Sequence, residues 1–163
     1  MKNKQNEICI EFDAISENEG LARIVIAAFL TNIDPTLEEI EDVKTAVSEA
    51  VTNSIIHGYE EKGGKIIMHA IMKSDKILEL NIYDKGVGIE DIELAMQPMF
   101  TTGSDKERSG MGFSFMEVFM DGVKVESSVG EGTAVHMWKC FDRKDKDMNI
   151  VLQSIVCNHN GGM

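Results

Sequence analysis

The sequence lacks the features that mark secreted, disulfide-bonded and membrane-spanning chains. It has three cysteines in 163 residues, an odd number without metal-binding or redox spacing, which favours a reducing interior. The longest apolar run, Ile24–Leu30, is far shorter than the roughly 20 residues that span a bilayer. We therefore expect no membrane segment. Because Met1–Glu7 contains lysine without an apolar stretch behind it, we also expect no secretory signal. We therefore expect a cytoplasmic location.

Basic residues are also scarce. Sixteen Lys and Arg oppose 28 Asp and Glu, which gives a formal net charge of −12. On the whole such a chain repels the phosphates of nucleic acid and attracts a basic protein partner. Solubility alone is the simpler explanation of this acidity. The charge therefore argues against direct nucleic-acid binding and does not identify a partner.

Two common nucleotide motifs are missing as well. No Gly-x-Gly-x-x-Gly follows the first predicted strand, and no Gly-Lys-Ser/Thr P-loop occurs anywhere. The length suits about one domain with its own hydrophobic core, and 43% of the residues are hydrophobic. We expect this domain to occupy residues 1–141 and a disordered tail to occupy residues 142–163.

What is present is an alternation of short strands and helices. Period-two patterns predict strands at residues 7–12, 65–73, 76–84, 123–128 and 133–140. Helical spacing and turn signals predict helices that begin at residue 16 and cover residues 34–57, 89–96 and 110–121. The order predicts an α+β fold, a two-layer sandwich in which helices cover one face of a mixed, mainly antiparallel sheet.

Local signals fix how the first two helices begin. Ser16 followed by Glu19 reads as a capping box, and the apolar residues after it recur at helical spacing. That apolar set is Leu21, Ile24, Val25, Ala28 and Phe29. Asp34-Pro35-Thr36 with Glu39 opens the second helix, which Gly58 should end.

The second helix carries two polar side chains one turn apart, Glu49 and Asn53, beside its buried stripe. The amide oxygen of Asn53 can be a ligand of Mg²⁺, which takes its remaining ligands from phosphate and water. Glu49 can accept the proton of an attacking hydroxyl near a terminal phosphate. A solvated helix face is the alternative explanation.

Asp84 ends an apolar strand, where a carboxylate is costly without a partner. An adenine amino group is a suitable donor, and the same carboxylate would repel the carbonyl of guanine. Gly86 and Gly88 allow close approach of backbone and base, and Thr133 can bring a hydroxyl to the base through water. An ordinary Asp-x-Gly turn is the alternative.

Gly110-Met111-Gly112 begins the helix predicted at 110–121, where free amide groups favour a phosphate. Residues 101–109 read as a mobile lid, and Arg108 within it can reach a terminal phosphate or a docked protein. Each motif alone is modest. Together their order and spacing predict a site for ATP and Mg²⁺.

These motifs resemble the N, G1 and G2 boxes of the GHKL superfamily, which has the Bergerat fold. The closer similarity is to the sporulation anti-sigma F factors, small serine protein kinases, and it covers roughly residues 7–141. It rests on residues 18–23, 34–36, 48–53, 97–102 and 107–113, in which Phe100-Thr101-Thr102 and Glu107-Arg108-Ser109-Gly110-Met111-Gly112 favour the sporulation type over the stress-response type.

The resemblance implies a homodimer that holds sigma factor F when ATP is bound and phosphorylates a serine of an anti-anti-sigma protein of the STAS type. It implies that Glu49 is the catalytic base, Asn53 the magnesium ligand and Asp84 the adenine contact. Arg23 would touch both protein partners. The remaining nucleotide contacts it implies are Gly86, Gly88, Thr101, Thr102, Arg108, Ser109, Gly110, Met111, Gly112, Phe113 and Thr133.

Three other functions remain open at this point. An anti-sigma kinase of a stress-type pathway has the same boxes, and a nucleotide-gated binding module would use them without catalysis. The catalytic domain of a histidine kinase is disfavoured, because no helical hairpin with a phospho-acceptor histidine precedes the domain.

The apolar stretch Ile150–Val156 departs from the family, whose members usually end soon after the last strand.

Overall fold

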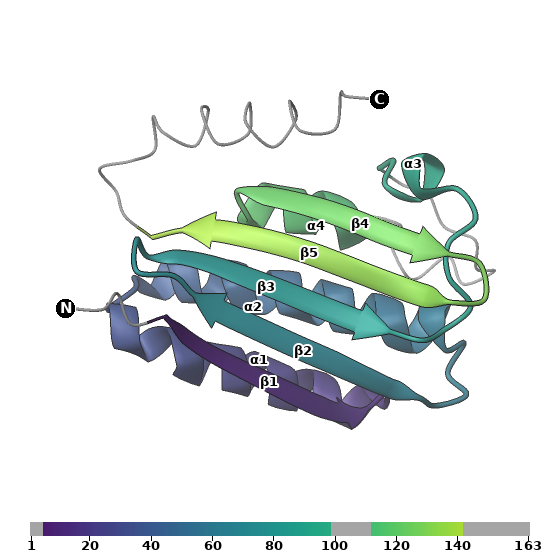
Figure 1. Ribbon diagram of the computed structural model, residues 1–163, viewed down its shortest axis with the longest axis horizontal. Coiled ribbons are helices and arrows are strands. Elements are labelled where there is room, and N and C mark those ends of the chain that lie inside the picture. The colour runs from purple at the N-terminus through teal and green to yellow at the C-terminus, as the bar shows by residue number, and fades with distance from the viewer. Residues whose placement is uncertain (1–4, 99–111, 142–163) are drawn as a thin grey trace.

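The computed structural model describes residues 5–98 and 112–141, which form a five-stranded sheet with helices on one face (Figure 1). The strands are β1 Asn6–Asp13, β2 Lys65–Met72, β3 Ile77–Asp84, β4 Gly122–Ser128 and β5 Gly132–Cys140. Their order across the sheet is β1-β2-β3-β5-β4, and each described pair is antiparallel. The predicted α+β sandwich is confirmed, and the mainly antiparallel sheet has no parallel pair among the described strands.

Three helices pack on the same side of the sheet (Figure 1). They are α1 Ser16–Leu30, α2 Leu37–Asn53 and α4 Gly112–Phe119. Short segments complete the described chain: the 3₁₀ turn η1 Thr31–Ile33, the π-helical turn η2 Ser54–Gly58 and α3 Ile92–Ala95. No helix in the described residues has both the length and the apolar character needed to cross a bilayer.

The core lies between the helices and the inner face of the sheet. Burial alternates residue by residue along β2 and β3, so every second side chain points to the helices. From the helix side, α2 contributes Val43, Ala46, Val47, Ala50 and Val51, all fully buried. The long α2 therefore forms the centre of the helical layer and positions the side chains on its neighbouring, less buried face.

The predicted start of α2 is confirmed. Thr36 is the N-cap, its hydroxyl accepts from the Glu39 backbone N–H at 3.2 Å, and the Glu39 carboxylate accepts from the Thr36 N–H at 2.8 Å. This reciprocal capping box fixes the phase of the helix. It thereby fixes the directions in which Glu49 and Asn53 point.

The helix predicted to begin at residue 16 is confirmed, but its predicted capping box of Ser16 and Glu19 does not form. Ile15, not Ser16, is the N-cap, and no side chain caps the helix. Leu21 and Ile24 are 46% and 68% exposed, whereas Ala22 and Ile26 are buried. Of the apolar set at helical spacing, Phe29 is buried and Val25 packs against the core, so packing buries only part of that set. Part of the apolar surface of α1 consequently faces outward.

The end of α2 contains a feature that the sequence pattern did not predict. After Asn53 the helix widens into the π-helical turn η2, where the Tyr59 N–H donates to the Ser54 carbonyl at 2.8 Å. Such turns insert one residue into the helical repeat and often occur at functional sites. The widening brings Gly58 next to the end of β3.

The described chain ends at Phe141, which is buried. Its backbone N–H donates to the Lys76 carbonyl at 3.1 Å, so it closes the sheet beside the β2–β3 turn. The predicted tail, residues 142–163, lies outside the described residues. The predicted domain boundary at 141 is therefore still a prediction.

Candidate nucleotide site

Glu49 and Asn53 lie beside the first residue of α4. A Cβ atom placed on Gly112 would be 3.1 Å from the Glu49 Oε2 atom and 3.2 Å from both amide atoms of Asn53. That separation is tighter than most side-chain contacts, so Gly112 lets the start of α4 approach the polar face of α2. Two sequence boxes that lie about sixty residues apart therefore meet in space.

The environment of Glu49 favours its protonated form more than water does. Partial burial raises the pKa of the Glu49 carboxyl, and the negative charge of Glu19 on α1 raises it further. A raised carboxyl pKa makes the carboxylate a stronger proton acceptor. This is the electrostatic property that a general base needs.

Asp84 is the buried carboxylate at the end of β3, with 7% of its surface exposed. Its Oδ1 atom accepts from the backbone N–H groups of Gly86 and Thr133, at 3.0 and 3.2 Å. Its Oδ2 atom accepts from the Ser54 hydroxyl at 2.8 Å. A carboxylate has about four acceptor positions, so Oδ2 can still accept from one more donor.

Glycines surround this carboxylate because no side chain fits there. A Cβ atom on Gly58 would lie 3.1 Å from the Asp84 carboxyl group, and one on Gly86 would overlap the Gly58 carbonyl. A Cβ on Gly132, whose φ is +96°, would overlap the Asp84 carbonyl. The strand end, the π-helical turn and the β4–β5 hairpin are therefore in close backbone contact around Asp84.

The second glycine of the Asp-x-Gly-x-Gly segment also meets its neighbour closely. Gly88 has φ of +75°, and a Cβ there would overlap the backbone of Ser128 in the β4–β5 hairpin. The Gly130 N–H donates to the Val87 carbonyl at 2.7 Å and secures the same contact. The loop after β3 is thus held against the hairpin that carries Thr133.

Thr133 reaches Asp84 through its backbone, not through its side chain. Its hydroxyl lies 2.9 Å from the Ser127 hydroxyl, which donates to the Gly132 carbonyl at 2.8 Å. Ser127 also accepts from the Ile89 N–H at 2.8 Å. This hydroxyl pair links the loop after β3 to the hairpin and holds the Thr133 side chain against Ser127.

Other predicted site residues are placed only in part. Phe113 on α4 is partly buried and packs against the core. Arg23 on α1 is 41% exposed, and its Nη1 atom lies 3.7 Å from Glu19 Oε1. The remaining predicted nucleotide contacts, Thr101, Thr102, Arg108, Ser109, Gly110 and Met111, lie outside the described residues, as does the predicted lid at residues 101–109.

Sequence analysis gave no site role to Ser54, Gly58 and Glu19. Ser54, the first residue of η2, continues the buried face of α2, and an isolated polar residue on such a face is the signal that could have identified it. Gly58 was read only as a helix stop, although it packs against Asp84. No local pattern could pair Glu19 with Glu49, because the two lie on different helices.

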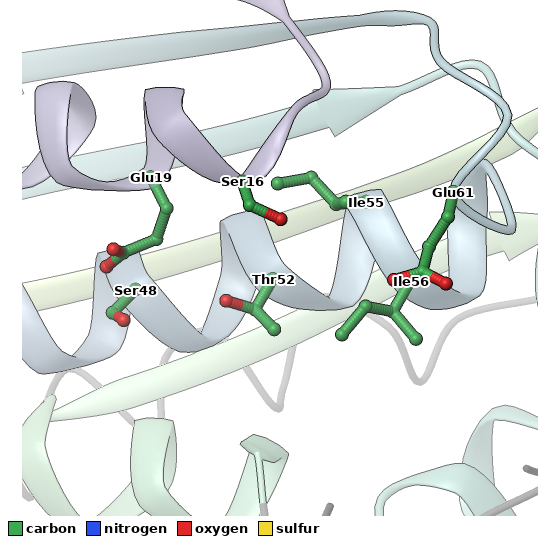
Figure 2. Close-up of a pocket in the computed structure, with 7 residues that line it drawn as sticks. All are labelled: Ser16, Glu19, Ser48, Thr52, Ile55, Ile56 and Glu61. Carbon is green, nitrogen blue, oxygen red and sulfur yellow. The ribbon is translucent and has the colours of Figure 1, made fainter. Parts of the chain in front are cut away.

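A pocket of about 230 Å³ lies between α1 and the end of α2 (Figure 2). Ser16, Glu19, Ser48, Thr52, Ile55, Ile56 and Glu61 line it. Ser48 and Thr52 immediately precede Glu49 and Asn53 in the chain. The pocket therefore adjoins the Glu49 end of the site and does not include Asp84.

The donor set fits a magnesium nucleotide better than a metal held by protein alone. Within residues 5–98 and 112–141, no group of three or more His, Cys, Asp or Glu side chains could hold a metal ion. Asn53 supplies one oxygen, and Mg²⁺ commonly takes its other ligands from phosphate and water. The described part of α4 begins beside it at Gly112, and the N-terminal end of a helix favours phosphate.

Comparison with known proteins identifies the family to which this fold belongs. The family model described as "Histidine kinase-like ATPase domain" matches residues 12–139. The RsbU and RsbW domains of a Mycobacterium tuberculosis protein superpose with a TM-score of 0.60 at 18% identity, over 83% of this chain and 32% of that one. A histidine kinase domain from Erythrobacter litoralis superposes with a TM-score of 0.53 at 19% identity, over 82% and 64%. The family model and the fold thus define a GHKL-type ATPase domain, a class that binds nucleotide.

Curated relatives show to which family of these ATPase domains the chain belongs. An anti-sigma F factor of Clostridium acetobutylicum is 55% identical over 84% of this chain and 95% of its own length. An anti-sigma F factor of Bacillus licheniformis is 50% identical over 83% and 92%. The chain belongs to the anti-sigma F factor family of histidine kinase-like ATPase domains.

Proposed function

We propose that this protein is an ATP-dependent serine protein kinase that also sequesters a sigma factor. One observation carries the proposal: Glu49, a carboxylate with raised pKa, lies against the first residue of a helix that can hold phosphate. A protein that only binds nucleotide needs no proton acceptor at that place. The family, whose members are named anti-sigma F factors, supplies the partner class.

The chain's own residues would divide the work as follows. Asp84 would accept from the adenine amino group through the free position on Oδ2, and its three existing donors hold it in place. Asn53 and the start of α4 would hold the phosphate end, and Mg²⁺ bound there would neutralise charge on the phosphates. Glu49 would accept the proton of the attacking serine hydroxyl, which makes its oxygen a better nucleophile.

The outward side of α1 supports a protein-docking role. Leu21 and Ile24 are exposed there, and Arg23 lies between them in sequence with 41% of its side chain exposed. A surface that combines apolar residues with an arginine is typical of protein interfaces. We propose that this surface contacts both sigma factor F and the serine-bearing anti-anti-sigma protein, and that the protein acts as a homodimer.

The direct test is Glu49→Gln, which keeps the shape of the side chain and removes the proton acceptor. We expect the variant to bind ATP with near-normal affinity by calorimetry. We expect it to lose about 10²-fold or more of its serine phosphorylation rate, because general-base catalysis contributes on that scale. The substrate is a recombinant anti-anti-sigma protein of a spore-forming relative.

Glu41→Gln is the matched control, because Glu41 lies on the same helix but is exposed. It should phosphorylate at the normal rate. Normal transfer by Glu49→Gln would remove Glu49 from the mechanism. If the unaltered protein binds ATP and transfers no phosphate, a nucleotide-gated binding module is the better description, and acid-labile phosphate on the chain itself would indicate a histidine kinase.

A further inference from the structure

Glu19 has an unusual environment for a carboxylate on a helix surface. Its Oε1 atom is shielded from solvent and has no hydrogen-bond partner among the described residues. Among the cations of residues 5–98 and 112–141, Arg23, one turn later on α1, approaches it at 3.7 Å. That distance exceeds a hydrogen bond, so the buried oxygen is incompletely compensated. Leaving such an atom without a hydrogen bond costs folding free energy, so a purely structural role does not account for Glu19 at this position.

The side chain points to the part of α2 that carries the proposed base. Figure 2 shows Glu19 projecting from α1 toward Ser48, with Thr52 one turn further along the same pocket. Glu49 immediately follows Ser48, so Glu19 meets α2 at the turn from which Glu49 projects. Glu49 itself reaches toward Gly112 on the α4 side. Glu19 therefore reaches this turn of α2 from α1, while Glu49 projects from the same turn toward α4.

We propose that Glu19 acts through Glu49 as a positioning residue for phosphoryl transfer, in that its negative charge strengthens Glu49 as a proton acceptor and Arg23 limits the effect. The inference rests on the proposed kinase function. It adds a residue on another helix that determines the strength of the base, and it gives Arg23 a second role besides partner contact.

The chemical step in which this matters is balanced as follows. The serine oxygen bonds to the γ-phosphorus, its proton moves to the Glu49 carboxylate, and the bond from the γ-phosphorus to the β,γ-bridging oxygen breaks, which releases ADP. A nearby negative charge stabilises the protonated form of Glu49 relative to the ionised form. The direction agrees with the raised pKa of Glu49, to which burial contributes most and Glu19 adds.

Other charged groups on the neighbouring elements do not replace Glu19. Glu17 on α1 and Glu117, the one titratable residue of α4, are both exposed. Asp42 on α2 is paired with Lys139 of β5 at 3.0 Å. Glu61 lines the pocket at its other end, beyond Ile56 (Figure 2). Among the described charged groups, Glu19 is thus the one whose removal should shift the pKa of Glu49.

The test measures Glu49 directly in the full chain. The carboxyl carbon of Glu49 is followed by ¹³C NMR during a pH titration and is assigned by its absence in Glu49→Gln. Glu19→Gln should move the Glu49 titration to lower pH. Arg23→Gln removes the compensating cation and should move it to higher pH. A change of packing alone gives no reason for opposite shifts, and unchanged titrations in both variants would overturn the proposal.

Kinetics supply the second measurement. In Glu19→Gln the acid limb of the rate of serine phosphorylation should move to lower pH, while the rate above the limb should fall by less than the ~10²-fold that loss of the base costs. The pH–rate profiles of Glu19→Gln and of the unaltered protein should therefore cross. Glu19→Asp keeps the charge and should restore the limb toward its original position, and Glu17→Gln is the matched control that should leave it unchanged.

The two proposals fail in different ways. If the NMR titration shifts as expected and the unaltered protein transfers no phosphate, the electrostatic coupling stands and the kinase function is wrong. If transfer occurs and depends on Glu49, but Glu19→Gln leaves both the titration and the acid limb unchanged, the kinase function stands and the role of Glu19 is wrong.

Discussion

At the scale of the residue, Asp84 shows how one buried carboxylate can be held by three donors and still have capacity for a ligand. Two backbone N–H groups bind Oδ1 and the Ser54 hydroxyl binds Oδ2. The strand end is therefore rigid before nucleotide arrives. This matters because a side chain that is already ordered loses little entropy on binding.

Asp84→Asn should separate binding from stability. If its amide oxygen takes the Oδ1 position, both backbone donors keep their acceptor, and the amide nitrogen can donate to the Ser54 oxygen. The acceptor for adenine is then lost, which should cost about 1.5–3 kcal/mol of ATP affinity, or roughly 10- to 150-fold. Calorimetry with ATP gives the affinity, and urea unfolding should show a change of free energy below about 1 kcal/mol.

Ser54→Ala is the complementary control. It keeps the carboxylate and removes one of its donors, so a buried oxygen of Asp84 is left unsatisfied. We expect a loss of about 1–3 kcal/mol in the free energy of unfolding. Equal effects of the two substitutions on both measurements would show that Asp84 has only a structural role.

At the scale of the element, α1 and α2 differ in how they begin. The capping box of Thr36 and Glu39 satisfies two backbone donors of α2, whereas no side chain caps α1. Both helices carry a hydroxyl residue followed three positions later by glutamate. The motif formed at Thr36, which has the extended backbone of an N-cap, and not at Ser16, which already lies inside α1.

Thr36→Ala should destabilise the protein by about 1 kcal/mol, within the 0.5–2 kcal/mol typical of lost N-caps. The measurement is the midpoint of urea unfolding at unchanged slope. Thr45→Ala is the matched control, because the Thr45 hydroxyl only donates to the Glu41 carbonyl of its own helix, at 2.8 Å, in a solvent-exposed hydrogen bond. Alanine is the better helix former there, so stability should not fall. A harmless Thr36→Ala would mean that packing alone holds the start of α2.

At the scale of the whole molecule, the insertion of β5 between β3 and β4 builds the site. It pairs Asp84 with Thr133 across neighbouring strands and closes the hairpin over Gly88. The loop after β3 and the β4–β5 hairpin are thus brought together only in the complete sheet. The last described residue, Phe141, is buried at the far end of the same strand.

We propose that residues 1–141 suffice for the folded, nucleotide-binding unit. A chain that ends at Phe141 should melt within a few degrees of the full chain and keep its ATP affinity. A chain that ends at Cys140 lacks the buried ring and should lose about 3 kcal/mol, comparable to removal of a buried phenylalanine. Calorimetric melting of both chains decides the matter, and a large loss in the longer one would place residues 142–163 within the folded unit.

The sequence by itself determined the kinds and order of the elements, since strand alternation, the Thr36 cap and the turn residues are local signals. It also placed the carboxylates and glycines that define the three boxes. Only the tertiary structure decided which face α1 buries, that α2 ends in a π-helical turn, that Ser54 and Gly58 hold Asp84, and that Glu19 approaches Glu49. Those features depend on contacts between residues distant in the chain, and a residue's neighbours in sequence carry no information about which distant group packing will bring against it.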